Sequence, residues 1–199
     1  MKIFLIIVAI LLIVFLVFQT WLFFSIRKTE VQAYSTVHKE SDLEIRYYPA
    51  ATYATIESPA KSYGELAVSG FRKLAGYIFG GNESNENIAM TSPVYMDIND
   101  TLSSMSFVLP SKYNETVAPV PNNRTVQLQK RDEVYVAVMR FRGFATDKKI
   151  TRISEKLKRA LQEKSISYSG NFKYLGYNPP YQLFGRRNEM VVSIEWNKP

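Results

Sequence analysis

Few residues in this chain could carry out covalent or metal chemistry. The 199 residues include no cysteine and a single histidine, His38. Without cysteine there is no thiolate nucleophile, no disulfide and no iron–sulfur ligand. One histidine excludes multi-histidine metal sites and argues against a Ser-His-Asp triad. The carboxylates of Glu57, Glu65 and Glu189 fall in different expected elements. The sequence therefore predicts a protein that is not an enzyme.

The composition instead favours a folded binding domain. Hydrophobic residues make up 46% of the chain and aromatic residues 14%, which excludes a disordered protein. The formal net charge is +7. No phosphate-binding glycine loop, zinc pattern or recognised nucleic-acid motif accompanies that charge, so we expect no nucleic-acid partner.

The first 26 residues indicate a membrane anchor. Residues 3–26 carry no charge, and as a helix they would extend about 36 Å, enough to cross a bilayer with some tilt. Trp21, Phe23 and Phe24 suit the membrane interface, and Arg27-Lys28 suits the headgroup layer. We expect a single-pass protein whose residues 1–26 are an uncleaved transmembrane signal anchor.

The alternative is a cleaved signal peptide, with Val31-Gln32-Ala33 as an acceptable cleavage site. Signal peptides have apolar regions of only ~7–15 residues, which favours the anchor. Four N-x-S/T patterns favour a lumenal or extracellular domain, in a host that glycosylates. They begin at Asn82, Asn99, Asn114 and Asn123.

The remaining chain divides into a tether and one domain. Residues 27–42 are polar and are expected to be a tether. Residues 43–57 alternate between apolar and polar side chains and predict a strand that is interrupted or bent at Pro49. The domain is expected to cover residues 43–196.

A helix is predicted after the first strand. Ser62 and Glu65 form a capping box, and Gly80-Gly81-Asn82 ends the helix. Spacings of three and four residues predict its apolar face. That face comprises Tyr63, Ala67, Phe71, Leu74 and Ile78.

The order strand–helix–strand–strand occurs twice along the domain. Strands are expected at 88–98 and 104–110, then at 125–142, 172–177 and 189–196. Thr146 or Asp147 caps a second helix. The pattern predicts an α+β fold, a pseudo-twofold repeat of β-α-β-β, with a curved antiparallel sheet or open barrel flanked by two helices.

Seven segments in the domain carry a family resemblance. They are Tyr48-Pro49-Ala50, Phe71-Arg72-Lys73-Leu74 with Tyr77-Ile78, Ile88-Ala89-Met90-Thr91-Ser92-Pro93-Val94, Phe107-Val108-Leu109-Pro110, Gly143-Phe144-Ala145-Thr146, Gly176-Tyr177-Asn178-Pro179-Pro180 and Gly185-Arg186-Arg187-Asn188-Glu189. In this order they resemble the SOUL haem-binding protein family. The resemblance covers residues 43–196 and implies a distorted antiparallel barrel of two β-α-β-β halves that binds haem or another tetrapyrrole without catalysis.

The resemblance also implies a haem surface beside the first helix. Some members of the family have a histidine, the suggested axial ligand, where this chain has Tyr47. A tyrosinate can ligate ferric haem if a neighbour such as Arg46 lowers its pKa. The alternative is a tyrosine packed against the sheet, since tyrosine is common in strands.

The other candidate haem contacts lie on the first helix and in the last hairpin. Val68, Arg72 and Ala75 would form an apolar and basic strip on the exposed side of the helix, and Arg186 could face the propionates. Arg186-Arg187 could instead cap the hairpin or pair with Glu189. A membrane-tethered protein-interaction module that has lost haem binding is the alternative function.

Overall fold

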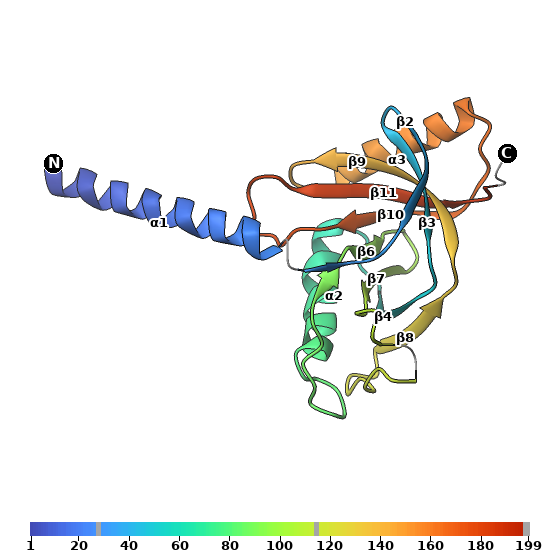
Figure 1. Cartoon of the computed structure of the whole chain (residues 1–199), viewed down its shortest axis with the longest axis horizontal. Helices are drawn as coiled ribbons and strands as arrows, with labels where there is room; N and C mark the ends of the chain where they lie inside the picture. The colour runs from blue at the N-terminus through green and yellow to red at the C-terminus, as the bar shows by residue number, and fades with distance from the viewer. Residues whose placement is uncertain (27–28, 114–115, 197–199) are drawn as a thin grey trace.

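The computed structural model describes residues 1–26, 29–113 and 116–196 of the chain (Figure 1). One apolar helix, α1 (Lys2–Ile26), extends away from a mixed α+β domain. Two further helices belong to the domain, α2 (Tyr63–Ile78) and α3 (Asp147–Glu163). Arg27-Lys28, expected in the headgroup layer, lie outside the described residues.

The strands form one large antiparallel sheet and one short parallel pair. The parallel pair joins β1 (Glu30–Val31) to β5 (Thr91–Ser92). The large sheet has nine strands in the order β2-β3-β9-β11-β10-β6-β7-β4-β8. Their bounds are β2 Ser35–Glu40, β3 Leu43–Tyr48, β4 Ala51–Ser58, β6 Val94–Asp97, β7 Ser103–Val108, β8 Val126–Arg131, β9 Val134–Arg142, β10 Tyr168–Gly176 and β11 Arg187–Ile194.

The sheet is not closed, so it is the curved antiparallel sheet that the pattern predicted, and the distorted barrel that the resemblance implied is open. Each end strand, β2 and β8, pairs with one neighbour, and the two do not pair with each other. The α+β class, the antiparallel sheet and the preceding apolar helix are confirmed. The pseudo-twofold repeat stays a prediction.

Both helices of the domain cover the same face of this curved sheet. Helix α2 packs on β4, β7 and β8, and α3 packs on β9, β10 and β11. Side chains from both helices and the sheet beneath them join one apolar core, which includes Leu66, Leu74 and Leu157. Burial of this face stabilises the domain at roughly 25 cal/mol per Å² of apolar surface.

The opposite face of the sheet carries a second, smaller cluster that is rich in tyrosine. It contains Tyr48, Tyr53, Tyr95 and Tyr177 among valines and Leu175. Because successive strand residues point to opposite faces, the strand β3 sends Ile45 into the helix-covered core and Tyr48 into the tyrosine cluster.

The ordered domain begins before residue 43. Within the expected tether 27–42, residues 30–31 and 35–40 form β1 and β2. Gln32 between them is buried, where its Nε2 donates to the Tyr53 hydroxyl at 2.7 Å and its Oε1 accepts from the Tyr95 hydroxyl at 2.6 Å. All six residues of β2 are exposed, so no alternation of polarity marked this edge strand in the sequence.

Candidate functional site

Helix α2 begins as the sequence predicted. The Ser62 side chain accepts a hydrogen bond from the Glu65 backbone amide at 3.3 Å, and a Glu65 carboxylate oxygen accepts one from the Lys61 amide at 3.1 Å. These contacts satisfy backbone donors at the helix start, which has no intrahelical partners for them. The cap fixes where α2 starts and therefore which residues point away from the sheet.

The buried face of α2 differs from the predicted one. It comprises Leu66, Gly70, Leu74, Tyr77 and Ile78. Of the five predicted residues, Leu74 and Ile78 are buried, while Phe71 is exposed and contacts Phe107 with its ring, centroid to centroid at 5.4 Å. Gly70 explains the difference: a side chain there would press on Ile56 and Met105 at 3.2 Å. Gly70 lets the helix approach the sheet closely and is itself buried. The spacing of apolar residues did not include it because glycine has no apolar side chain.

The outward side of α2 carries an apolar and a basic side chain between two glycines. Gly64, Val68, Arg72 and Gly76 follow one another at intervals of four residues and form one stripe, which we call the outer stripe. Val68 is 64% exposed. A Cβ added at Gly64 or Gly76 would meet nothing within 4 Å, so both ends of the stripe are open.

A third predicted contact residue, Ala75, adjoins the outer stripe and is half-buried. Arg72 within the stripe is exposed, and so is its neighbour Lys73. The predicted strip of Val68, Arg72 and Ala75 therefore lies together on the outward side of one helix.

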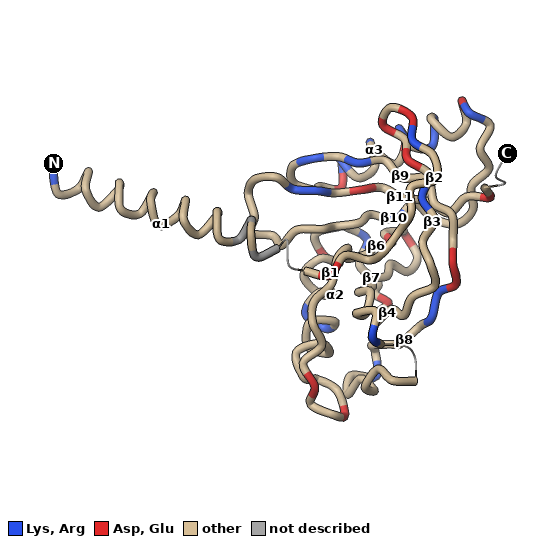
Figure 2. Tube along the Cα trace, in the orientation of Figure 1, with Lys and Arg blue, Asp and Glu red and all other residues tan. Residues whose placement is uncertain are grey.

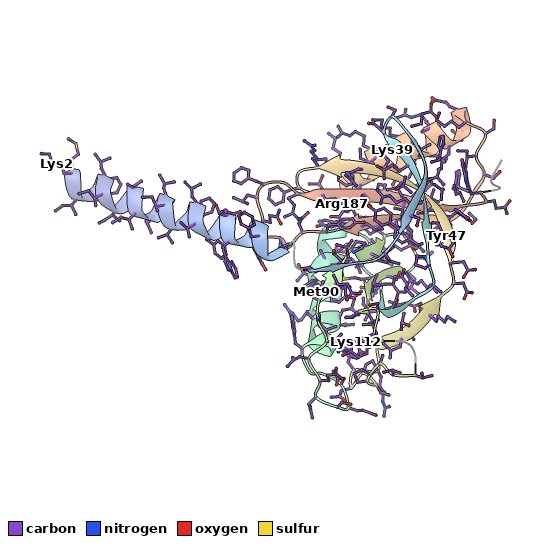
Figure 3. The ribbon with its side chains drawn as sticks, in the orientation of Figure 1. Lys2, Lys39, Tyr47, Met90, Lys112 and Arg187 are labelled. Atoms are coloured by element: carbon purple, nitrogen blue, oxygen red, sulfur yellow. The ribbon has the colours of Figure 1, made fainter. Side chains whose placement is uncertain are left out.

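Tyr47 lies elsewhere in the domain. It is half-buried on β3, where its ring contacts that of Tyr135 on β9 at 5.3 Å between centroids. Figure 3 places Tyr47 across the domain from α2. The adjacent Arg46 points to the other face of the strand, because side chains alternate along β3. The structure therefore brings Tyr47 neither to the outer stripe nor beside the guanidinium of Arg46.

Arg46 is occupied by a buried ion-pair network that the sequence did not predict. Its Nη1 donates to Glu189 Oε2 at 2.8 Å, and both side chains are fully buried. Arg140 and Arg187 also contact Glu189 Oε1, and the Tyr177 hydroxyl donates to Oε2 at 2.8 Å. Burial alone would raise the pKa of Glu189, but its hydrogen bond to Arg46 and the surrounding positive charges hold that pKa below its ordinary value.

Arg186 holds a loop together. It is buried, and its Nη1 donates to the carbonyl oxygens of Pro179 at 2.8 Å and Gln182 at 2.7 Å. Its guanidinium carbon lies 4.6 Å from the centre of the Phe144 ring. Of the two arginines in this hairpin, Arg187 pairs with Glu189 and Arg186 caps the loop.

The histidine and two core methionines are placed away from the outer stripe. His38 lies on the exposed edge strand β2 and contacts Trp196, with 5.7 Å between ring centroids. Met96 and Met105 are buried in the core. No group of three or more histidine, aspartate or glutamate side chains that could hold a metal ion occurs in the described ranges 1–26, 29–113 and 116–196.

Two pockets of the domain do not suit haem. The first, on the tyrosine-rich face, has a volume of about 200 Å³, below the usual range for ligand pockets. The second, between the N-terminal ends of α2 and α3, is about 600 Å³. Asp100 and Asp147 line it with one cation, Lys61, so the lining carries a net negative charge that disfavours the propionates of haem. A haem on this domain therefore fits an open surface better than either cavity.

Comparison with known proteins decides the family. The family model for SOUL heme-binding protein matches residues 29–193. The chain belongs to the SOUL family. The matched range begins at residue 29, one residue before β1, and so includes the strands that precede β3.

Relatives named as heme-binding proteins resemble this SOUL chain along most of their length. It is 32% identical over 154 residues to "Heme-binding protein 1" of Xenopus laevis, covering 74% of this chain and 80% of the relative. It is 30% identical over 164 residues to "Heme-binding protein 2" of Mus musculus, covering 78% and 79%.

Solved structures share the fold at low identity. The EcmrR C-terminal domain has a TM-score of 0.56 and 8% identity, with 82% of this chain and 99% of that domain covered. A structure described as a hydrolase from Listeria innocua has a TM-score of 0.57 and 8% identity, covering 80% and 94%. At this identity the likeness concerns the fold alone.

Proposed function

We propose that this SOUL chain is a membrane-anchored, non-catalytic protein that binds haem or another tetrapyrrole reversibly on the outer stripe of α2, for buffering or transfer. The observation that carries the proposal is the outward side of α2, where Val68 is exposed beside Arg72 and the glycines leave open space. Membership of a family named for haem binding supports the ligand class.

The residues present fit a surface-bound tetrapyrrole. A large flat ring needs an apolar contact, which Val68 and the neighbouring Phe71 offer, and the open glycines allow close approach. Arg72 and Lys73 are exposed cations on the same helix that can pair with the two propionates. Bound haem would supply its iron chemistry, and these side chains would hold and orient it.

Tyr47 and Arg186 have other roles in this proposal. Tyr47 is too distant from α2 in the domain to ligate a haem on the outer stripe (Figure 3). The Nη1 and Nη2 donors of Arg186 are directed to loop carbonyls. We propose that neither contacts the haem. A variant of Tyr47 therefore distinguishes a haem on the outer stripe from a haem at β3.

Hemin titrated into the full-length chain in lipid nanodiscs tests the proposal, with the Soret band as readout and empty nanodiscs as the background. Val68→Glu places a carboxylate beside the propionates and is expected to weaken binding about tenfold or more. Val37→Glu, the same change on the exposed strand β2, should leave binding unchanged.

Tyr47→Phe should also leave the titration unchanged. If Tyr47→Phe abolishes the shift while Val68→Glu does not, the haem lies at β3 and the outer stripe is not the site. A full-length chain that gives no saturable shift contradicts haem binding altogether. In that case the protein-interaction module becomes the function to test.

The anchor is supported by α1. Lys2–Trp21 has a mean hydropathy of 3.1, and none of that segment is buried against the domain. An apolar helix exposed on all sides requires lipid or protein around it. A signal sequence near the N-terminus meets the same length and composition criteria. Retention in the membrane pellet after alkaline carbonate, with the N-terminal peptide present in the mature chain, is the expected result for an anchor.

A further inference from the structure

Two neighbouring loops expose apolar side chains at one end of the domain. The loop between β9 and α3 exposes Phe144, and the loop between β10 and β11 exposes three more side chains. Their exposed fractions are 49% for Phe144, 56% for Tyr181, 41% for Leu183 and 68% for Phe184. We call these four residues the aromatic tip. A group of this kind on a soluble surface indicates an interaction site.

Buried polar contacts make the two loops one surface. Arg186, which caps the β10–β11 loop, also lies against the Phe144 ring of the other loop. Asn188 Nδ2 donates to the Gly143 carbonyl at 2.7 Å, and Gln182 Nε2 donates to the Phe184 carbonyl at 2.7 Å. The aromatic tip is therefore held in shape by the fold.

The apolar helix α1 contacts this loop directly. Gln19 Nε2 donates to the Tyr181 carbonyl at 3.3 Å, and the Leu183 amide donates to Gln19 Oε1 at 3.4 Å. Figure 1 shows the β10–β11 loop beside the domain end of α1. Within α1, the candidate membrane span is Lys2–Trp21, and Gln19 precedes Trp21 by two positions, a rise of about 3 Å along the helix. The tip thus lies level with the end of the segment that would cross the bilayer.

Basic side chains surround the tip. Arg140 and Arg142 are exposed at the end of β9, and Arg187 is partly exposed at the start of β11. Arg140 and Arg187 also contact the buried Glu189. Figure 2 shows these strand ends on the side of the domain nearest α1. Arginines near a membrane surface are attracted to anionic lipids, while aromatic rings favour the headgroup layer.

We propose that the aromatic tip enters the headgroup layer of the bilayer that α1 spans, with the surrounding arginines on anionic lipids. The inference rests on the proposed anchoring by α1. It fixes how the domain lies on the membrane: the β9–α3 and β10–β11 loops face the lipid, and the edge strand β2 does not.

The chain contains no cysteine, so single labelled positions test the proposal directly. Phe184→Cys, Phe144→Cys, Leu12→Cys and Val37→Cys each receive a nitroxide spin label in the full-length chain. The proteins are placed in nanodiscs of phosphatidylcholine and phosphatidylserine. Accessibility to oxygen, which concentrates in lipid, and to a water-soluble nickel complex then reports the depth of each label.

We expect the Phe184 and Phe144 labels to lie at headgroup depth, the Leu12 label in the hydrocarbon and the Val37 label in water. If the labels at Phe184 and Phe144 are as accessible to water as the Val37 label while the Leu12 label lies in lipid, the tip does not enter the headgroup layer. The proposed anchoring by α1 is then unaffected. A Leu12 label in water overturns the anchor and the tip with it. Two tip positions on separate loops guard against misfolding of either variant.

Discussion

Arg46 and Glu189 form a fully buried ion pair between residues 143 positions apart, with Nη1 and Oε2 separated by 2.8 Å. Arg46 lies on β3 and Glu189 on β11, and β9 runs between these two strands. The pair therefore links β3 to β11 across the strand β9 that lies between them. Removing a charge from water costs free energy, and the attraction between Arg46 and Glu189 offsets that cost for both side chains.

Loss of one partner of this pair should destabilise the domain strongly. We expect Arg46→Met to lower the free energy of unfolding by about 3–5 kcal/mol, because Glu189 would remain buried with less compensation. The double variant Arg46→Met with Glu189→Leu should be less destabilised than the sum of the single variants. Denaturant unfolding of all four proteins gives the coupling energy.

The exposed pair of Lys156 and Asp42, at 2.6 Å, is the matched control. Lys156→Met should cost no more than about 1 kcal/mol, because water screens the interaction. Equal losses from the buried and exposed changes would contradict the importance assigned to Arg46.

Acid should weaken the same network. Burial opposes the charged form of Glu44, but hydrogen bonds from Arg46 and Lys39 lower its pKa from 4.5 to about 2. A carboxyl whose pKa is lowered on folding contributes stability above its unfolded pKa and loses that contribution as the pH falls through the folded value. Stability should therefore decline between about pH 5 and pH 2, and Glu44→Gln should make the decline shallower. Urea unfolding at stepped pH measures this, and an unchanged slope would refute it.

Two glycines of α2 should respond in opposite directions to the same substitution. At Gly70 a Cβ would meet Ile56 and Met105 at 3.2 Å, so Gly70→Ala is expected to destabilise the domain by about 1–3 kcal/mol. At Gly76 a Cβ meets nothing within 4 Å, so Gly76→Ala should stabilise it by roughly 0.5–1 kcal/mol through helix propensity. Thermal unfolding of the pair decides the question, and a stabilising Gly70→Ala would mean that α2 sits farther from the sheet.

Only some of the predicted glycosylation positions are accessible. Asn82 is fully buried, and its Nδ2 donates to the carbonyls of Tyr77 and Glu86. Asn123 is exposed, and Asn114 lies outside the described residues. In a glycosylating host we expect Asn123→Gln to remove one glycan and Asn82→Gln to remove none while costing about 1–3 kcal/mol in stability. Gel mobility before and after glycosidase treatment shows the glycan number; loss of a glycan in Asn82→Gln would contradict the burial.

Sequence patterns located most of the elements because strand-forming runs and helix caps are local features. The strand material that became β9 and the capping signals of α2 and α3 are confirmed. The edge strand β2 was missed because it is exposed on both faces, and the face of α2 was shifted by Gly70. A strand that is exposed on both faces shows no alternation of polar and apolar residues. The close approach of α2 to the sheet at Gly70 depends on tertiary contacts, which the spacing of apolar residues does not record.

Contacts between distant segments explain the remaining differences. The sequence motifs identified the family. The lack of cysteine and of a second histidine excluded chemistry that needs a thiolate or several histidines. Whether Arg46 faces Tyr47 or Glu189, and whether Arg186 faces a ligand or its own loop, was decided by the tertiary structure. A buried guanidinium needs oxygen acceptors because it has lost its contact with water. Which acceptors lie within reach depends on which strands and loops are neighbours in the folded domain.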